Sequence, residues 1–268
     1  MTRGDAMSIR QLLTEPALAE VDVDSPDRII QHRSILLRKK MIREVFFEIY
    51  DVLADAERRH FSPAPGRRIE IGAGSSLLKM AMPDVEVTDV VPYAGLDRVV
   101  DAQDMPFEDG ALKTIFAIHC FHHLPDPYRF LAEVERVCRP GGGAIMIDPY
   151  YGPTASLLYK RLFTSEHFDK AGPAVVPPGG PISGANQALS YIVFVRERDR
   201  LAQQFPNLEL VEMEPISNYI RYTVSGGLNF RQLLPDASIP LLKGIEALLS
   251  PLRRMLALHQ LIVVRKKC

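Results

Sequence analysis

Four side chains that could bind a metal or move a proton stand within five positions of one another. They are His119, Cys120, His122 and His123, in the stretch AIHCFHHLPDP. A zinc site needs about four converging ligands. Side chains at a strand end alternate between opposite faces, and no second pair of Cys or His ligands follows at the usual spacing. The stretch therefore predicts no metal site.

Proton transfer is a better explanation of this stretch than metal binding. Histidine titrates near neutrality, and a side chain that takes a proton from an attacking hydroxyl or amine raises a rate roughly 10²–10⁴-fold. His119 and His122 are therefore the candidate catalytic residues. The alternative is structural: His122 and His123 would hydrogen-bond the turn and the next helix. For His123 we expect this structural role.

A pair of glycines follows a short apolar run in RRIEIGAGSSLL. Gly72 and Gly74 let the backbone approach a ligand closely, and a short helix beginning near Ser75 would offer free N–H groups to it. A dinucleotide fingerprint requires a third glycine, and Leu77 stands at that position. The pattern therefore indicates a ligand-binding loop and disfavours a nicotinamide cofactor.

Two acids stand at the ends of the next two apolar runs, VEVTD and DRVVD. Asp89 and Asp101 would then lie at the carboxyl edge of a parallel sheet, where open α/β folds bind ligands. A carboxylate can accept bonds from both hydroxyls of a ribose, at roughly 1.5–3 kcal/mol for each charge-assisted bond. The alternative for both acids is a solvated loop position.

The elements around these residues alternate between short apolar runs and helical stretches. Such alternation predicts an α/β fold with a doubly wound, mostly parallel sheet. The runs are RRIEI, VEVTD, DRVVD, LKTIFAIH, GGAIMIDP, LELVEMEP and HQLIVV. The helices include PDPYRFLAEVERVCRP, a stretch near 195–205 and an amphipathic stretch near 240–257.

Helical stretches also precede the first strand. Ser25 and Pro26 begin one helix, and from Ile35 to Leu53 apolar residues follow a single helical stripe. We therefore predict an N-terminal helical cap over 1–60 and a Rossmann-like domain over 61–268. Residues 149–190, rich in Pro and Gly, read as a long loop inserted as a lid.

Composition narrows the function classes further. The 268 residues carry a formal net charge of -1, which disfavours nucleic acid as a partner. Three cysteines far apart in the sequence suggest a reducing compartment. The first residues lack the apolar region of a signal peptide, and no apolar run is long enough to cross a membrane. We expect a cytoplasmic protein.

At this point the chain resembles a known family. The stretches EIGAGSS, TDVVP, DAQDMPFEDG, AIHCFHHLPDP and RFLAEVERVCRPGGGAIMIDP follow one another between residues 67 and 149. In this order they resemble the class I S-adenosylmethionine-dependent methyltransferases, in particular the small-molecule enzymes with a type 11 methyltransferase domain. The resemblance implies a seven-stranded Rossmann-like sheet whose last strand is antiparallel.

The resemblance also implies a cofactor, S-adenosyl-L-methionine, with S-adenosyl-L-homocysteine as its product. The implied cofactor-binding residues are Glu70 near the amino-acid end, Gly72, Ala73 and Gly74 beneath it, Asp89 and Val90 at the ribose, Asp101, Ala102 and Met105 around the adenine, and Ile118 and His119 on the substrate side. Two features depart from the family pattern. Ser76 stands where glycine is expected, and VVPYAGLDRVV leaves no room for a full crossover helix between two strands.

Candidate substrate residues lie beyond the fifth apolar run. Asp148 and Tyr151 in DPYYG end a strand on the ligand edge, and His167 stands in SEHFD. DPYYG is similar to the DPPY signature of methyltransferases that act on amino groups, but that signature follows the fourth strand and this one follows the fifth. The alternatives are packing for Tyr151 and a solvated turn for His167.

The expected activity is methyl transfer to a small-molecule acceptor, with a hydroxyl oxygen preferred because it gains most from a nearby histidine. The expected partners are this small molecule and a second copy in a homodimer. Two other functions stay open: a nicotinamide-dependent oxidoreductase, and a non-catalytic subunit that binds the cofactor.

Overall fold

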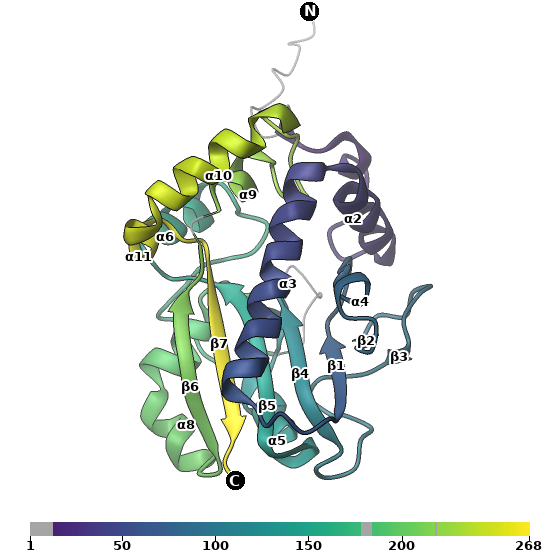
Figure 1. The fold of residues 1–268 in the computed structure, drawn as a ribbon, viewed down its shortest axis with the longest axis vertical. Coiled ribbons are helices and arrows are strands. Elements are labelled where there is room, and N and C mark those ends of the chain that lie inside the picture. The colour runs from purple at the N-terminus through teal and green to yellow at the C-terminus, as the bar shows by residue number, and fades with distance from the viewer. Residues whose placement is uncertain (1–12, 178–183, 218) are drawn as a thin grey trace, which may run out of the picture.

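The fold is a single mixed sheet with helices on both faces (Figure 1). A computed structural model describes residues 13–177, 184–217 and 219–268. The strand order within these residues is β3-β2-β1-β4-β5-β7-β6. The strands are β1 Arg67–Ile71, β2 Glu86–Asp89, β3 Arg98–Val99, β4 Leu112–Ile118, β5 Cys138–Pro149, β6 Leu208–Pro215 and β7 His259–Lys266. Among these strands β7 alone runs opposite to the others, since its pairings with β5 and β6 are antiparallel and the remaining pairings are parallel. This confirms the predicted Rossmann-like sheet.

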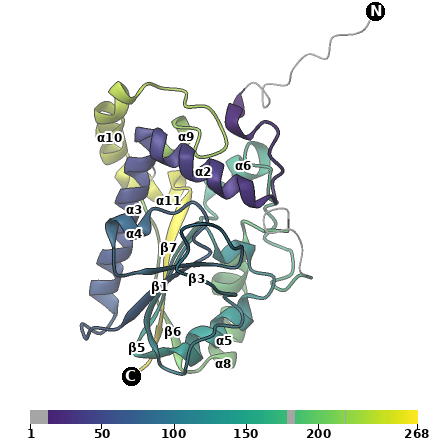
Figure 2. The ribbon, with the colours of Figure 1, turned by 90° about the vertical axis from the view of Figure 1, so that its right-hand side faces the viewer.

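Alternate residues of the central strands bury their side chains in two separate cores. Ile115 and Ala117 of β4 pack on the face covered by α5 (Pro127–Val137). Phe116 and Ile118 pack on the opposite face, covered by α3 (Lys40–His60). Figure 2 shows the helices on either side of the sheet. Because both faces are buried, the strands read as continuous apolar runs.

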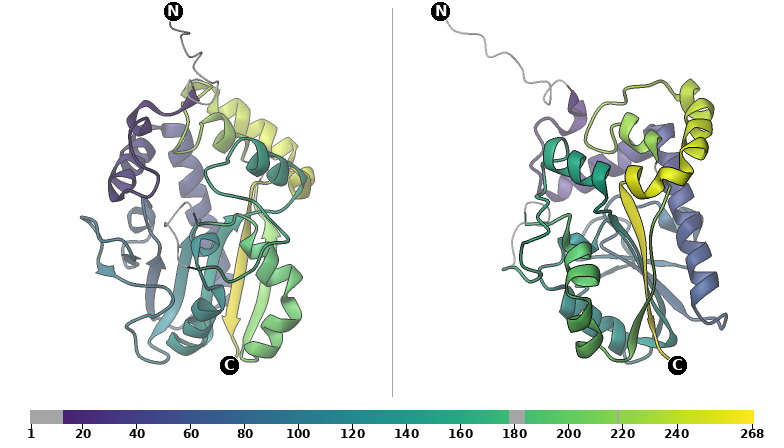
Figure 3. Two further views of the ribbon diagram at one scale, coloured as in Figure 1. Left: turned by 180° about the vertical axis from the view of Figure 1, so that it is seen from behind. Right: turned by 90° about the vertical axis from the view of Figure 1, so that its left-hand side faces the viewer.

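Further helices gather beyond the carboxyl ends of the parallel strands (Figures 1 and 3). These are α2 Pro26–Arg38, α6 Pro153–Arg161, α9 Ile220–Val224, α10 Ile239–Leu248 and α11 Arg253–Leu256. The remaining helices are α4 Leu78–Ala81, α7 Leu189–Tyr191 and α8 Arg198–Gln204. The helix expected over 240–257 is thus divided into α10 and α11. As expected, residues 90–97 between β2 and β3 form no helix.

The N-terminal stripe predicted as one helix from Ile35 is two helices. Ile35 belongs to α2, and Lys39 breaks the pattern with an extended backbone (ψ 102°). The buried ammonium of Lys39 lies 2.9 Å from Oε2 of Glu15 and donates to the carbonyl of Phe230. These partners explain the break, because the buried charge requires them. The predicted cap at Ser25 is present, since its hydroxyl accepts from the N–H of Asp27.

The predicted boundary at residue 60 stays a prediction. In the structure α3 is part of the core beneath the sheet rather than of a separate layer. The segment 149–190 contains α6 and α7, and its residues 178–183 lie outside the described part. A lid role for this segment also stays a prediction. Within the described residues no helix is long and apolar enough to cross a membrane.

A buried ion pair joins the helices above the sheet and allows a stability prediction. Arg221 of α9 is 2% exposed, and its Nε lies 2.8 Å from Oε2 of Glu246 on α10. Arg221→Ala would leave this carboxylate buried without its partner, so we expect a loss of about 3–5 kcal/mol in the free energy of unfolding. Urea denaturation measures it. The exposed Arg253→Ala should change it by less than about 0.5 kcal/mol; equal losses would contradict the prediction.

Candidate functional site

The glycine loop after β1 has a backbone that only glycine accommodates well. Gly72 and Gly74 both have positive φ, 55° and 48°, a region that other residues rarely adopt. A Cβ on Gly72 would lie 2.2 Å from Sγ of Cys120. The loop is therefore packed directly against the residues that follow β4.

Asp89, at the end of β2, fixes the same loop from the other side. Its Oδ2 accepts a bond from the N–H of Gly74 at 2.8 Å, and its Oδ1 accepts from Val91 at 2.9 Å. The residue is 6% exposed. Each carboxylate oxygen can accept more than one bond, so Asp89 can hold the loop and a ligand hydroxyl together.

Ser76, which stands where the resemblance predicts glycine, is tied to the N-terminal helices. The carbonyl of Ser76 accepts from Arg33 of α2 at 2.6 Å. The hydroxyl of Tyr50 on α3 accepts from the N–H of Leu77 at 2.8 Å. The helix expected near Ser75 begins only at Leu78. Contacts with α2 and α3 therefore hold the loop where a longer helix would otherwise follow.

Glu70 is a buried acid beneath this loop. It is 1% exposed, and the side chain of Ser76 is its nearest hydrogen-bonding group, although no described residue makes a hydrogen bond of good geometry to either oxygen. Burial, with the nearby Asp89 carboxylate, raises the pKa of Glu70 to about 8. A cationic or hydrogen-bonding ligand group would satisfy these oxygens, which makes Glu70 a fitting residue beside a cofactor.

A cavity of about 590 Å³ opens over the loop, within the usual size range of small-molecule sites. Most of the predicted cofactor residues line it: Gly72, Ala73, Gly74, Asp89, Val90, Asp101, Ala102, Ile118 and His119. Residues of α2 form another wall, among them Ile29 and His32. Glu70 and Met105 do not line this cavity. Met105 lies in the core, and its N–H donates to Glu133 at 2.6 Å.

A second cavity of about 220 Å³ adjoins the first and shares His119 with it. His119 follows β4 with a φ of 52°, and its N–H donates to the carbonyl of Ile147 at 2.8 Å. Its ring lies 4.5 Å from that of His259 and 6.4 Å from that of Tyr222. Nε2 of His119 is buried and has no hydrogen-bond partner among the described residues. Burial lowers the pKa of His119 well below its usual value, so the ring is neutral near pH 7.

His122 differs from His119 because it lies between two carboxylates. Its Nδ1 is 2.7 Å from Oδ1 of Asp148, and its Nε2 is 3.2 Å from Oε2 of Glu166. Burial opposes the charged ring, but the two acids outweigh it and raise the pKa of His122 to about 10. A ring already protonated at neutral pH cannot accept a proton, so in this state His122 is an ion-pair partner. A catalytic role for His119 or His122 stays a prediction.

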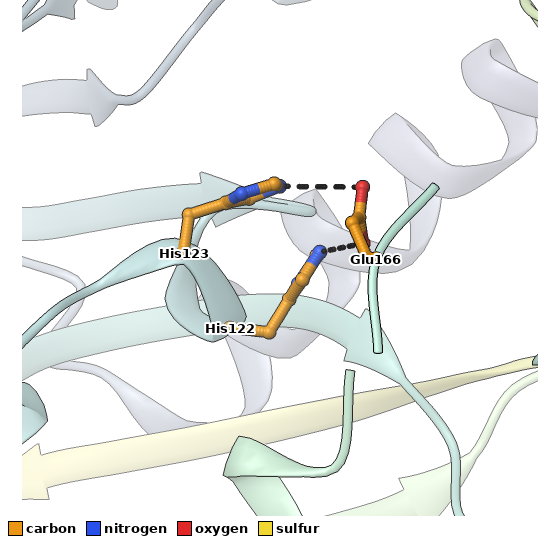
Figure 4. A group of neighbouring side chains, drawn as sticks. All are labelled: His122, His123 and Glu166. Atoms are coloured by element: carbon orange, nitrogen blue, oxygen red, sulfur yellow. Dashed lines mark ion pairs between the residues drawn. The ribbon is translucent and has the colours of Figure 1, made fainter. Parts of the chain in front are cut away.

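His122 also belongs to a group of three possible metal ligands. Nitrogens of His122 and His123 and an oxygen of Glu166 all lie within 4.8 Å of one another (Figure 4). The geometric objection to a metal site in AIHCFHHLPDP assumed a strand end, whereas Phe121–His123 is a short 3-10 turn. A third possible ligand, Glu166, comes from the segment after β5. The absence of a metal therefore remains an untested prediction.

None of the three predicted substrate residues, Asp148, Tyr151 and His167, lines either cavity. Asp148 is fully buried behind His122 and lines neither cavity. Tyr151 packs its ring against Tyr150 and Tyr191 at 4.8 and 5.0 Å. Tyr151 and His167 also lie outside both linings. Their role in substrate binding stays a prediction.

Three residues that line the smaller cavity were not predicted from the sequence: Glu166, Tyr222 and His259. His259 could have been found, because an antiparallel last strand begins at the edge where the parallel strands end. In the structure His259 faces Pro149 in the β5–β7 register. Glu166 stands beside His167 in SEHFD, and Tyr222 on α9 carries no sequence signal.

Parts of the chain are similar in sequence to known methyltransferases. Residues 71–146 match the family model of a methyltransferase domain. Tocopherol O-methyltransferase of Arabidopsis thaliana is 40% identical over 64 residues, 24% of this chain and 18% of that protein. Phosphatidylethanolamine N-methyltransferase of Cereibacter sphaeroides is 28% identical over 120 residues, 37% and 59% of the two chains. The chain thus spans less than two thirds of either relative. A solved geranyl diphosphate C-methyltransferase of Streptomyces coelicolor A3(2) is 15% identical, with 82% and 79% coverage and a TM-score of 0.43.

The ion pair of His122 makes stability depend on pH. Because the pKa of His122 is raised in the folded state, the ion pair contributes fully to the free energy of unfolding below the unfolded pKa of about 6.5. This contribution is lost as the pH rises toward about 10. The double variant His122→Asn, Asp148→Asn removes both charges. We expect the difference in free energy of unfolding between wild type and this variant to shrink over that range. A constant difference in urea denaturation series would contradict the charged assignment.

Proposed function

We propose that this chain, whose residues 71–146 are a methyltransferase domain, transfers a methyl group from S-adenosylmethionine to a small-molecule acceptor by in-line displacement. The observation that carries the proposal is that two cavities adjoin each other, a larger one over the glycine loop and a smaller one lined by imidazole and phenol rings. Several residues line both cavities, His119, His123 and Tyr222 among them. A donor in the first cavity and an acceptor in the second would therefore lie next to each other, with His119 at their boundary.

The residues of the larger cavity suit the proposed cofactor. The backbone of Gly72 and Gly74 admits close approach, and Asp89 can accept from ribose hydroxyls. Glu70, buried beneath the loop and outside the cavity lining, would lie near the amino-acid end. When bound, the cofactor supplies a methyl group on a positively charged sulfur. Leu77, where a dinucleotide site has glycine, and the methyltransferase domain together disfavour the nicotinamide alternative.

The main contribution of the protein to the proposed reaction is to position the methyl donor and the acceptor. Holding two reactants in line supplies roughly 7–11 kcal/mol of the barrier by itself. The rings of His119, Tyr222 and His259 would exclude water from the acceptor and align it. His119 is neutral and its Nε2 is unpartnered among the described residues, so it can accept a hydrogen bond or a proton from an acceptor hydroxyl.

A hydroxyl oxygen is the acceptor that this arrangement favours, because it must lose a proton and His119 can receive it. The relatives named above methylate oxygen, nitrogen and carbon according to their names. The proposal further includes a cytoplasmic location and a homodimer. A non-catalytic subunit would bind S-adenosylhomocysteine and show no turnover with any acceptor. Incubation with methyl-labelled cofactor and fractionated metabolites, followed by identification of the labelled product, distinguishes the two.

Asp89 tests the cofactor. Asp89→Ala should weaken S-adenosylhomocysteine binding at least tenfold, about 1.4 kcal/mol, because the ribose would lose its carboxylate partner. Isothermal calorimetry measures the affinity, and circular dichroism checks that the variant is folded. Asp109→Ala, at an acid that lies away from the cavity linings, is the control. Unchanged affinity in Asp89→Ala would refute the cofactor assignment.

His119 tests the acceptor side. His119→Asn keeps a residue that tolerates positive φ and removes the imidazole. We expect kcat to fall at least tenfold while the affinity for S-adenosylhomocysteine changes less than threefold. Steady-state kinetics on the labelled product and calorimetry give the two values. Weaker cofactor binding with an unchanged kcat would make His119 a cofactor contact instead.

A further inference from the structure

His122, His123 and Glu166 form a compact group of nitrogen and oxygen donors. Nε2 of His122 lies 3.2 Å from Oε2 of Glu166, and Nε2 of His123 lies 4.0 Å from Oε1. Ligand atoms about 2.1 Å from a tetrahedral zinc ion are about 3.4 Å apart. The first contact is close to this spacing, and the second needs an adjustment of less than about 1 Å. All three ligand atoms lie within 4.8 Å of one another, so the two imidazole nitrogens must close by at most about 1.4 Å. Figure 4 shows both imidazole nitrogens directed at the one carboxylate.

The environment of His122 has the second feature of a metal site. A histidine that binds a metal through one nitrogen almost always places its other nitrogen on a carboxylate or carbonyl, which fixes the ring. Nδ1 of His122 lies 2.7 Å from the fully buried Asp148. This leaves Nε2 directed at Glu166. The order carboxylate, imidazole, ligand position is thus built into the ends of β4 and β5.

The backbone also holds the two histidines together. Phe121–His123 is a short 3-10 turn, and the rings of His122 and His123 lie 4.1 Å apart at an angle of 39°. Neighbouring side chains of a 3-10 turn lie about 120° apart, closer than the opposite faces on which a strand would place them. Glu166 arrives from the segment between α6 and α7.

We propose that His122, His123 and Glu166 bind a divalent transition-metal ion, which would replace the proton on Nε2 of His122, with Asp148 as the positioning residue behind His122. Two imidazoles and one carboxylate form the donor set of catalytic zinc sites, which keep a further coordination position open. His123 and Glu166 line both cavities. The open position therefore faces the space where donor and acceptor would meet.

The role of this ion in methyl transfer rests on the proposed function, whereas its binding does not. An oxygen or nitrogen of the acceptor would occupy the open position, and the positive ion would favour the deprotonated form of a bound hydroxyl. The substrate class would then be molecules with a metal-binding group next to the methylated atom.

Metal binding is tested on the full chain without a histidine tag. We expect calorimetry with zinc chloride to give one ion per chain, and cobalt chloride to give the visible absorption of an ion with nitrogen and oxygen ligands. His123→Ala and Glu166→Gln should each weaken zinc at least tenfold. Asp148→Asn should weaken it about 10–100-fold. The matched control is His60→Ala, a histidine at the far end of α3 that is paired with Glu212, and it should leave the affinity unchanged.

The outcomes of these experiments distinguish a failure of the metal-site proposal from a failure of the proposed methyltransferase function. The metal-site proposal is overturned if the wild-type chain binds no stoichiometric zinc or shows no cobalt absorption. Because this measurement uses the intact wild-type chain, it does not depend on whether a variant folds. Equal weakening by His60→Ala means surface binding and also overturns the metal-site proposal. Zinc binding without S-adenosylhomocysteine binding upholds the metal site and refutes the methyltransferase; the reverse result refutes only the metal site.

Discussion

The pairing of Asp148 with His122 is the interaction on which the candidate site depends. Asp148 is fully buried in β5, and its Oδ1 lies 2.7 Å from Nδ1 of His122 and accepts from the backbone N–H of the same residue at 3.4 Å. A buried carboxylate is costly without a partner, so the turn after β4 is held against the end of β5. This fixes the orientation of His119 before the turn and of His123 within it.

The elements of the fold could be predicted because burial imposes a simple pattern on them. Strands covered on both faces are apolar in their central residues, as residues 115–118 of β4 and 144–147 of β5 show in sequence. Glycines with positive φ and an acid at a strand end are local signals, so Gly72, Gly74 and Asp89 could be predicted to lie together. The structure brings them to one cavity.

Other features depend on contacts between distant residues and leave no such pattern. Lys39 interrupts a helical stripe because its ammonium is drawn to Glu15 and to a carbonyl near residue 230. Glu166 reaches His122 through an irregular segment after β5. Charge states also follow from the fold: His119 and His122 are three residues apart, yet burial lowers the pKa of His119 and two acids raise that of His122.

The position of β7 has a consequence for how the molecule is made. β7 lies between β5 and β6, so β6, which is synthesised earlier, joins the sheet only through β7. An unpaired strand edge is prone to pair with another chain. During synthesis β6 therefore stays unpaired until β7 has been made. The smaller cavity lacks His259 until β7 inserts between β5 and β6. Assembly of the ligand-binding edge is thus a late, long-range step, which favours slow folding and couples completion of the sheet to completion of the site.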